Sequence, residues 1–175
     1  QDQVGSAVSE AGDVNGDGYG DLAVGAVGSE PGGEVLVFHG SLYGPGDTPD
    51  WSYTQSTASA WFGSTIDSAG DLNGDGYGDL VAGAQSYQDS LAGEGGAWAW
   101  LGSASGLAAT ADWSWSPGYQ HGKAGTAVAG AGDLNGDGFA DIVSGAPHYL
   151  GVGAALVFHG SVSGLSVDPD ALLLG

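Results

Sequence analysis

One nine-residue pattern occurs three times in this chain. In each copy, oxygen-bearing side chains occupy positions 1, 3, 5 and 9, and a glycine occupies position 6. This spacing suits a hard cation such as Ca²⁺, which takes six to eight oxygen ligands at about 2.3–2.6 Å. The main-chain carbonyl of position 7 can add one more oxygen. The pattern predicts three Ca²⁺ sites, with ligands from Asp13, Asn15, Asp17, Tyr19 and Asp21, from Asp71, Asn73, Asp75, Tyr77 and Asp79, and from Asp133, Asn135, Asp137, Phe139 and Asp141.

An ordinary turn is the alternative interpretation of a single copy. Asp, Asn and Gly cluster in turns because Asx side chains bond their own backbone and Gly accepts a positive φ. A turn, however, does not require an acid at positions 1, 5 and 9 in every copy. Carboxylates held this close repel one another unless a cation lies between them. The threefold repetition therefore favours metal binding.

The pattern departs from an EF-hand at two points. An EF-hand needs a bidentate Glu at position 12, where this chain has Val24, Ala82 and Ser144. The flanking residues are also short apolar runs ended by Gly, such as Leu22–Ala26, which are typical of buried strands and not of helices. Each loop is therefore expected to join two strands of a hairpin.

The charge balance excludes several classes of partner. The formal net charge is −20, and Lys123 is the one basic residue. A field of this sign opposes binding to nucleic acid or to an anionic membrane surface. Six Trp and an apolar content of 42% are sufficient for a packed core, which argues against disorder. No apolar stretch of about 18 residues occurs, so membrane insertion is not expected.

The metal loop belongs to a longer repeat. Successive loops begin 58 and 62 residues apart, and each repeat holds four candidate strands. Repeats of this length are typical of stacked units or propeller blades, and four strands make one blade. The sequence therefore predicts an all-β chain of three four-stranded antiparallel blades over residues 1–53, 54–116 and 117–175.

Three segments carry a resemblance to a known family. Phe62-Gly63, the loop Asp71–Asp79 and Gly145-Ala146-Pro147 resemble the FG-GAP repeat of the integrin α-subunit β-propeller. The resemblance implies that each calcium loop joins strands 1 and 2 on one face. It also implies that the opposite face, formed by the 2–3 and 4–1 loops, contacts a protein or glycan ligand. These loops are residues 27–33, 85–95, 147–152, 54–61 and 117–123.

The number of blades departs from the family, whose propellers close with about seven. Propellers in general use four to eight blades, and three leave an apolar blade face free at each end. Free apolar faces mark interfaces, so we expect a homodimer of two arcs that closes a six-bladed ring. The alternative is that the chain is a piece of a longer protein or an engineered fragment.

The function predicted from the resemblance is a calcium-binding adhesion or protein-interaction scaffold, extracellular, at the cell surface or periplasmic. A lectin-like propeller is the second interpretation, because Trp51 with Tyr53 and Trp113 with Trp115 place two aromatic rings on one strand face. The same pattern is also typical of packing between blades. Trp61, in a 4–1 loop, is the expected anchor for a protein contact.

A polysaccharide hydrolase or lyase is the third interpretation, since paired carboxyls perform such chemistry. Calcium would occupy the loop acids, and no shared pattern is expected among Asp67, Asp89, Asp112 and Glu94. No nucleophile motif occurs, so the chain is predicted not to be an enzyme.

The histidines fit this interpretation. His39 and His159 occupy one repeat position, where repeat 2 has Leu101. This substitution favours a strand-end role over a metal or acid–base role. His121 and His148 lie in the predicted partner-face loops, as contact residues or as plain solvent-facing residues.

Overall fold

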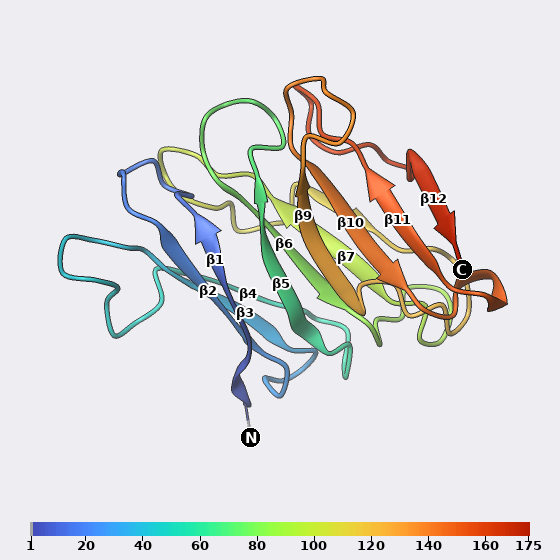
Figure 1. Cartoon of the computed structure of the whole chain (residues 1–175). Coiled ribbons are helices and arrows are strands. Elements are labelled where there is room, and N and C mark those ends of the chain that lie inside the picture. The colour runs from blue at the N-terminus through green and yellow to red at the C-terminus, as the bar shows by residue number, and fades with distance from the viewer. Residues whose placement is uncertain (1) are drawn as a thin grey trace.

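A computed structural model describes residues 2–175, which form three four-stranded antiparallel sheets. These sheets are called blades 1, 2 and 3 (Figure 1). Blade 1 contains β1 (Val4–Gly12), β2 (Asp21–Ala26), β3 (Glu34–Phe38) and β4 (Trp51–Thr54); blade 2 contains β5 (Phe62–Gly70), β6 (Asp79–Ala84), β7 (Gly96–Trp100) and β8 (Trp113–Trp115); blade 3 contains β9 (Ala127–Gly132), β10 (Asp141–Ala146), β11 (Ala154–Phe158) and β12 (Ala171–Leu174). The predicted all-β class and the prediction of three four-stranded antiparallel blades are confirmed. β4 extends to Thr54, one residue past the segment 1–53.

In each blade the strands pair in chain order, so every blade is a simple antiparallel meander. The first strand of each blade ends at a glycine with positive φ, which lets the chain leave the ladder and enter the metal loop: Gly12, Gly70 and Gly132. One short 3₁₀ turn, η1 (Tyr149–Gly151), lies in the 2–3 loop of blade 3. No helix in residues 2–175 is long and apolar enough to cross a membrane.

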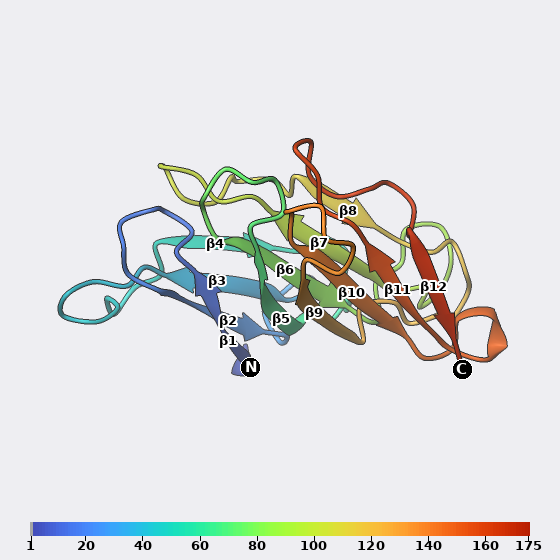
Figure 2. The ribbon, with the colours of Figure 1, turned by 45° about the horizontal axis from the view of Figure 1, so that its top comes forward.

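The three blades lie side by side, with β1 beside β5 and β5 beside β9 (Figures 1 and 2). The hydrophobic core is accordingly divided into two layers. One layer lies between blades 1 and 2 and includes Val35, Phe62 and Trp100. The other lies between blades 2 and 3 and includes Leu72 and Phe158. Each layer is built from the facing sides of two sheets, as in a propeller.

The paired aromatics of the fourth strands pack into these layers. Trp51 and Tyr53 contact the ring of Trp100 edge-on, with ring centroids 5.4 and 5.0 Å away. Trp113 and Trp115 contact Phe158 in the same way. The pattern read from the sequence as either a sugar platform or blade packing therefore forms blade packing.

The indole N–H groups strengthen this arrangement. Trp51 Nε1 donates to the carbonyl of Ala108 and Trp113 Nε1 donates to that of Ser166, both at 2.8 Å. Each acceptor lies in the 3–4 loop of the next blade. The fourth strand of one blade is thus tied to its neighbour by both rings and hydrogen bonds.

Candidate metal loops and the opposite loop face

Each nine-residue loop connects the first two strands of its blade and is ordered by its own side chains. In the first loop, Asp13 accepts hydrogen bonds from the N–H groups of Asp17 (3.1 Å) and Gly18 (2.9 Å). The Asn15 amide donates to Asp17 Oδ2 at 3.0 Å, and Asp17 Oδ1 accepts from Tyr19 N–H at 2.9 Å. These Asx-type bonds bring the side chains of positions 1, 3 and 5 together.

The other two loops repeat this geometry. Asp71 and Asp133 each accept from the N–H of the position-6 glycine at 2.9 Å. The position-3 amides donate to the position-5 carboxylates at 2.9 Å in the second loop and 2.8 Å in the third. Three independent sequences therefore adopt one loop conformation.

The position-9 acid is buried and holds each loop to the rest of its blade. Asp21 Oδ2 accepts from Val14 N–H and Oδ1 accepts from Gly40 N–H, both at 2.8 Å. Asp79 and Asp141 make the equivalent bonds, and both are 0% exposed. Asp21, Asp79 and Asp141 thus link the metal loop, the second strand and the start of the 3–4 loop.

The buried acid of the second loop has a strongly raised pKa. Burial, together with the smaller effect of the neighbouring carboxylates of Asp75 and Asp71, raises the pKa of Asp79 to about 7 in spite of its two backbone hydrogen bonds. At Asp133, which faces solvent, the N–H of Gly138 leads the effects that lower the pKa. The single basic residue, Lys123, lies in the opposite set of loops. No fixed cation of the chain therefore balances these carboxylates.

The donor set of each loop fits Ca²⁺, because it offers carboxylate, amide and carbonyl oxygens and no nitrogen or sulfur ligand. Within residues 2–175, no group of three or more His, Cys, Asp or Glu side chains is already arranged around a metal position. The carboxylates instead accept backbone N–H groups, each of which uses only part of an oxygen's acceptor capacity. The ligand assignment stays a prediction.

A second acid pattern was missed from the sequence. Asp112 shares its role with Asp50 and Asp170, its equivalents in the other two blades. Each carboxylate accepts the N–H of the residue that follows the third strand, at 2.8–2.9 Å. The Asp-Trp dipeptides Asp50-Trp51 and Asp112-Trp113 were the available signal. These acids close the 3–4 loops.

The repeat-equivalent histidines both follow directly after a strand, as predicted, because β3 ends at Phe38 and β11 at Phe158. His159 Nδ1 lies 3.2 Å from Asp141 Oδ2. The imidazole therefore borders the third metal loop at its buried acid, whereas His39 makes no such contact among the described residues.

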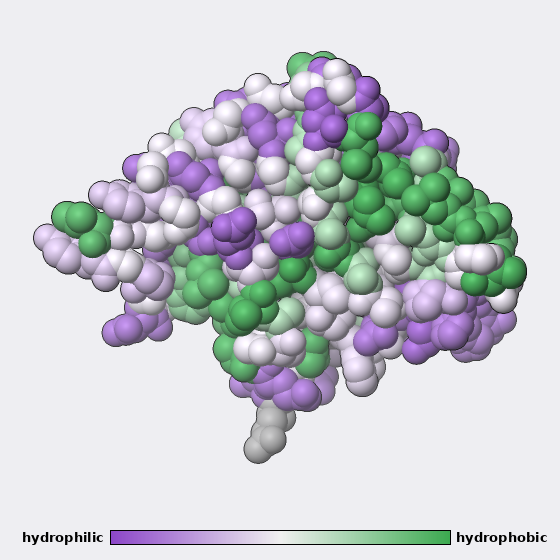
Figure 3. Space-filling model, in the orientation of Figure 1, coloured by the Kyte–Doolittle hydropathy of each residue, from purple (hydrophilic) through white to green (hydrophobic). Residues whose placement is uncertain are grey.

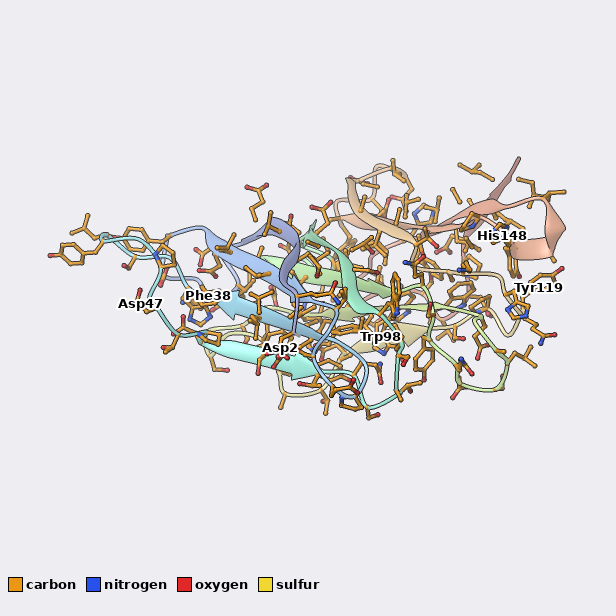
Figure 4. The ribbon with its side chains drawn as sticks, turned by 90° about the horizontal axis from the view of Figure 1, so that it is seen from below. Asp2, Phe38, Asp47, Trp98, Tyr119 and His148 are labelled. Atoms are coloured by element: carbon orange, nitrogen blue, oxygen red, sulfur yellow. The ribbon has the colours of Figure 1, made fainter. Side chains whose placement is uncertain are left out.

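The predicted partner-face loops lie together on the edge opposite the metal loops. The 2–3 loops of blades 1 and 2 are each hydrogen-bonded to the following 4–1 loop: Ser59 N–H donates to Pro31 O, and His121 N–H donates to Ala92 O, both at 2.9 Å. Figure 4 places Tyr119 and His148 near each other, far from Asp47 in a 3–4 loop. The rings of Tyr119 and Tyr149 make an edge-on contact with centroids 5.4 Å apart.

Glu94 organises one of these loops, a role that its sequence position did not reveal. Its side chain is 0% exposed, and Oε1 accepts the N–H groups of Asp89, Ser90 and Leu91 at 2.7, 2.8 and 3.1 Å. Burial acts to raise the pKa of Glu94, but these three hydrogen bonds outweigh it and lower the pKa. The carboxylate therefore stays ionised and holds the 2–3 loop of blade 2.

Two further features are candidates for contact with a ligand. Trp61 is 52% exposed in its 4–1 loop, as expected for a contact residue. A cavity of about 430 Å³ at blade 2 is lined by aromatic and acidic side chains, including Tyr87, Trp98, Asp89 and Asp168.

Comparison with known proteins gives a consistent result. The FG-GAP repeat model matches residues 5–38, 62–100 and 124–158, one match in each blade. Integrin alpha-6 of Gallus gallus is 38% identical over 114 residues, which cover 60% of this chain and 10% of the relative. Integrin alpha-3 of Mus musculus is 36% identical over 117 residues (66% and 11%), and integrin alpha-PS2 of Drosophila melanogaster is 43% identical over 90 residues (47% and 6%). The chain thus spans about a tenth of the length of these relatives.

Proposed function

Because the chain belongs to the FG-GAP repeat family, we propose that it is a calcium-binding, integrin-α-like propeller module that serves as an adhesion or protein-interaction scaffold. The observation that carries the proposal is the set of three acidic loops with the same hydrogen bonds, each with a buried Asp and no fixed counter-cation. A divalent ion at each loop supplies the missing positive charge. Millimolar extracellular calcium is sufficient even for weak sites, so the module is expected to act outside the cytosol.

The proposed role of calcium is structural. The ion would be held by the loop residues named above, and it supplies charge neutralisation and a fixed loop shape. Ligand that binds only the folded state stabilises it by about 2.7 kcal/mol per site at a hundredfold excess over Kd. For a chain of this size, 1 kcal/mol corresponds to roughly 2–4 °C. Three filled sites therefore raise the melting temperature by roughly 15–30 °C.

Binding, and not catalysis, is the proposed activity. The acid whose pKa is raised, Asp79, belongs to a metal loop, while the buried acid outside the loops, Glu94, has a lowered pKa. A general acid poised in a cleft would show the opposite arrangement. The exposed Trp61 and the joined 2–3 and 4–1 loops instead offer a surface for a protein ligand.

Calcium titration of chelator-stripped protein by calorimetry tests the metal proposal. We expect three sites per chain, weak competition by Mg²⁺, and a melting temperature that falls on chelation by the amount given above. The variant Asp75→Ala removes one position-5 carboxylate and should lose one site. Asp47→Ala, which removes an exposed acid outside the loops, is the matched control. Full stoichiometry in Asp75→Ala, or a melt unchanged by chelator, refutes the proposal.

Glycan binding is a second candidate, favoured by the cavity at blade 2. Sugar rings stack on aromatic faces while their hydroxyls bond carboxylates, and this cavity offers both. Its site would be Tyr87 and Asp89, not the packed fourth-strand aromatics. Glycan-array binding that is lost in Tyr87→Ala, with the melting temperature kept, would support this candidate over a protein ligand.

A further inference from the structure

Each metal loop carries an Asn-Gly pair at positions 3 and 4: Asn15-Gly16, Asn73-Gly74 and Asn135-Gly136. An asparagine amide is lost most easily when glycine follows it, because glycine has no side chain to hinder attack by its own backbone nitrogen. The three glycines are exposed. The loops lie along the upper edge of the molecule in Figure 1, and Figure 3 shows mostly hydrophilic and intermediate residues there. Water therefore reaches all three pairs.

The reaction needs only these two residues and water. The Gly N–H gives its proton to the solvent, and the nitrogen attacks Cγ of the Asn side chain. The Cγ–Nδ2 bond breaks, Nδ2 takes up a proton and leaves as ammonia, and a cyclic succinimide remains. Water then adds to either carbonyl of the ring. The product is an aspartate, or an isoaspartate whose main chain runs through the former side chain.

The folded loop opposes this reaction by fixing the Asn side chain. Asn15 Nδ2 donates to Asp17 Oδ2 at 3.0 Å, and Asn15 Oδ1 accepts Asp17 N–H at 3.0 Å. The same two bonds hold Asn73 to Asp75, at 2.9 and 3.1 Å. Ring closure requires the amide carbon and the Gly nitrogen to turn toward each other, so these bonds must break. Conversion therefore proceeds through loops that have opened locally, and its rate follows the open fraction.

The first two loops form a matched pair. Their nine residues differ only at position 2, which is Val14 in one and Leu72 in the other. In both loops an aromatic ring of the next loop lies so close to the position-4 glycine that a Cβ there would overlap it. The two pairs should therefore have the same intrinsic reactivity, and a difference between them in the folded protein comes from the structure.

One hydrogen bond distinguishes the two loops. Gly74 N–H donates to Asp71 Oδ1 at 2.7 Å, whereas Gly16 N–H makes no hydrogen bond within residues 2–175. The bond helps to hold the second loop closed. It also keeps the Gly74 nitrogen protonated, because the negative charge of Asp71 opposes formation of a nitrogen anion. A hydrogen bond to a charged group is sufficient to change the open fraction roughly tenfold. Asn15 should therefore react faster than Asn73.

We propose that the position-3 asparagine of the metal loops is a site of spontaneous modification, that Asn15 converts faster than Asn73, and that a bound cation suppresses the reaction. A cation that takes the Asn oxygen as a ligand holds the loop closed. At a hundredfold excess over Kd it lowers the open fraction about a hundredfold. The protection by calcium rests on the proposed function, whereas the order of the two rates rests on the loop hydrogen bonds alone.

The modification changes both the loop and the contact between blades. Conversion of Asn15 to aspartate adds a negative charge beside the carboxylates of Asp13 and Asp17, in a chain whose net charge is already −20. Conversion to isoaspartate lengthens the main chain just before Gly16, where the ring of Tyr77 packs. A first loop that has lost its cation would therefore be altered permanently, and with it the contact between blades 1 and 2.

Peptide mapping by mass spectrometry tests the inference on the whole chain, incubated at pH 8 below the melting temperature measured in chelator. Each Asn is followed by the mass gained when NH₂ is replaced by OH, and isoaspartate is identified from its fragment ions. In chelator we expect Asn15 to convert roughly tenfold faster than Asn73. In concentrated urea the two should convert at the same rate. In excess calcium the conversion of Asn15 should slow about a hundredfold.

Two variants serve as controls. Asn15→Gln, whose longer side chain closes a ring far more slowly, should lose the modification at position 15 and keep that at Asn73. Asp71→Ala frees the Gly74 N–H, so it should raise the rate at Asn73 at least to that of Asn15 and leave Asn15 unchanged. Folded protein in which Asn73 converts as fast as Asn15 overturns the proposal. So does an Asn15 that stays intact in chelator while the chain in urea reacts.

The calcium arm separates this proposal from the proposed function. If Asn15 converts equally fast with and without calcium while calorimetry shows three bound ions, the proposed protection is wrong and the metal sites stand. If calorimetry shows no bound ions, the calcium proposal has failed, and the order of Asn15 and Asn73 in chelator still decides whether the modification site is correctly assigned.

Discussion

Glu94 offers a sharp test of how the partner-face edge is held in shape. Its buried carboxylate is the common acceptor for three consecutive N–H groups, those of Asp89, Ser90 and Leu91. Glu94→Gln keeps the size and one acceptor oxygen but removes the charge. Hydrogen bonds to a charged group contribute about 1.5–3 kcal/mol, against about 0.5–1.5 kcal/mol for neutral pairs. Part of that difference is offset by the cost of burying the charge, so we expect a loss of about 1–3 kcal/mol in the free energy of unfolding at pH 7.

The pH dependence of that loss follows from the lowered pKa of Glu94 in the folded protein. Because the pKa is lowered in the folded protein, the ionised carboxylate contributes its full stabilisation above the unfolded value of about 4.3. This stabilisation disappears as the pH falls through the folded pKa, because the folded carboxylate then also takes a proton. The gap between wild type and Glu94→Gln should therefore be constant from pH 8 to about pH 5 and should shrink at lower pH.

Urea unfolding across this pH range, in calcium, measures the gap, and amide hydrogen exchange locates it. The N–H groups of Asp89, Ser90 and Leu91 should exchange faster in Glu94→Gln than in wild type. Asp89→Asn, an exposed substitution in the same loop, should leave the free energy of unfolding within about 0.5 kcal/mol of wild type. If Glu94→Gln matches wild type from pH 5 to 8 and its loop amides stay equally protected, the assigned role of Glu94 is wrong.

Asp79 and Leu72 are buried and Trp61 is half exposed, so their substitutions should have different effects. Because burial raises the pKa of Asp79 to about 7, this group stabilises metal-free protein at low pH, and about 2 kcal/mol should be lost as the pH rises from 5 to 7; melts in chelator measure this slope, and Asp79→Asn should flatten it. Leu72→Ala should lower the free energy of unfolding by about 2–5 kcal/mol because the side chain is fully buried. The equivalent Leu134→Ala should lower it by under about 1 kcal/mol because Leu134 is 55% exposed. Equal losses in urea unfolding would contradict this difference in burial. Trp61→Ala should change stability by less than about 1 kcal/mol but weaken binding to the best ligand from an extracellular-matrix protein panel at least tenfold, and undiminished binding would remove Trp61 from the contact surface.

The features that the sequence predicted correctly are those encoded locally. The loop Asp71–Asp79 and the apolar run after it carry their own turn chemistry and strand pattern, so the hairpin follows from neighbouring residues alone. The fourth strands were recognisable from Trp51 and Trp113, although a strand pattern does not say what its aromatic face contacts. In the structure these rings pack against Trp100 and Phe158, so they form interfaces between blades and not a platform for a sugar.

The features that were missed depend on contacts distant in the chain. Asp112 accepts from Leu101 N–H, 11 residues away, and the repeated Asp-Trp dipeptide marks its position without showing which donor it binds. Glu94 is unique to blade 2, since Gly32 and Val152 stand at its repeat positions, so a comparison of repeats offers no signal. Burial of a lone acid can be read only from the folded chain, where three N–H groups converge on it.

The metal loops also take part in the interfaces between blades. Position 4 of a loop is not one of the predicted metal-ligand positions, yet Gly16 and Gly74 receive the aromatic ring of the next loop. The backbone carbonyl of Asp13 accepts from Gly78, and that of Asp71 accepts from Ala140. Ordering of one loop by a cation therefore also orders the surface against which the next blade packs. Because every interface of the arc includes such a pair, loop order and blade packing are expected to melt together, and a chain stripped of metal should lose its inter-blade contacts before its individual hairpins.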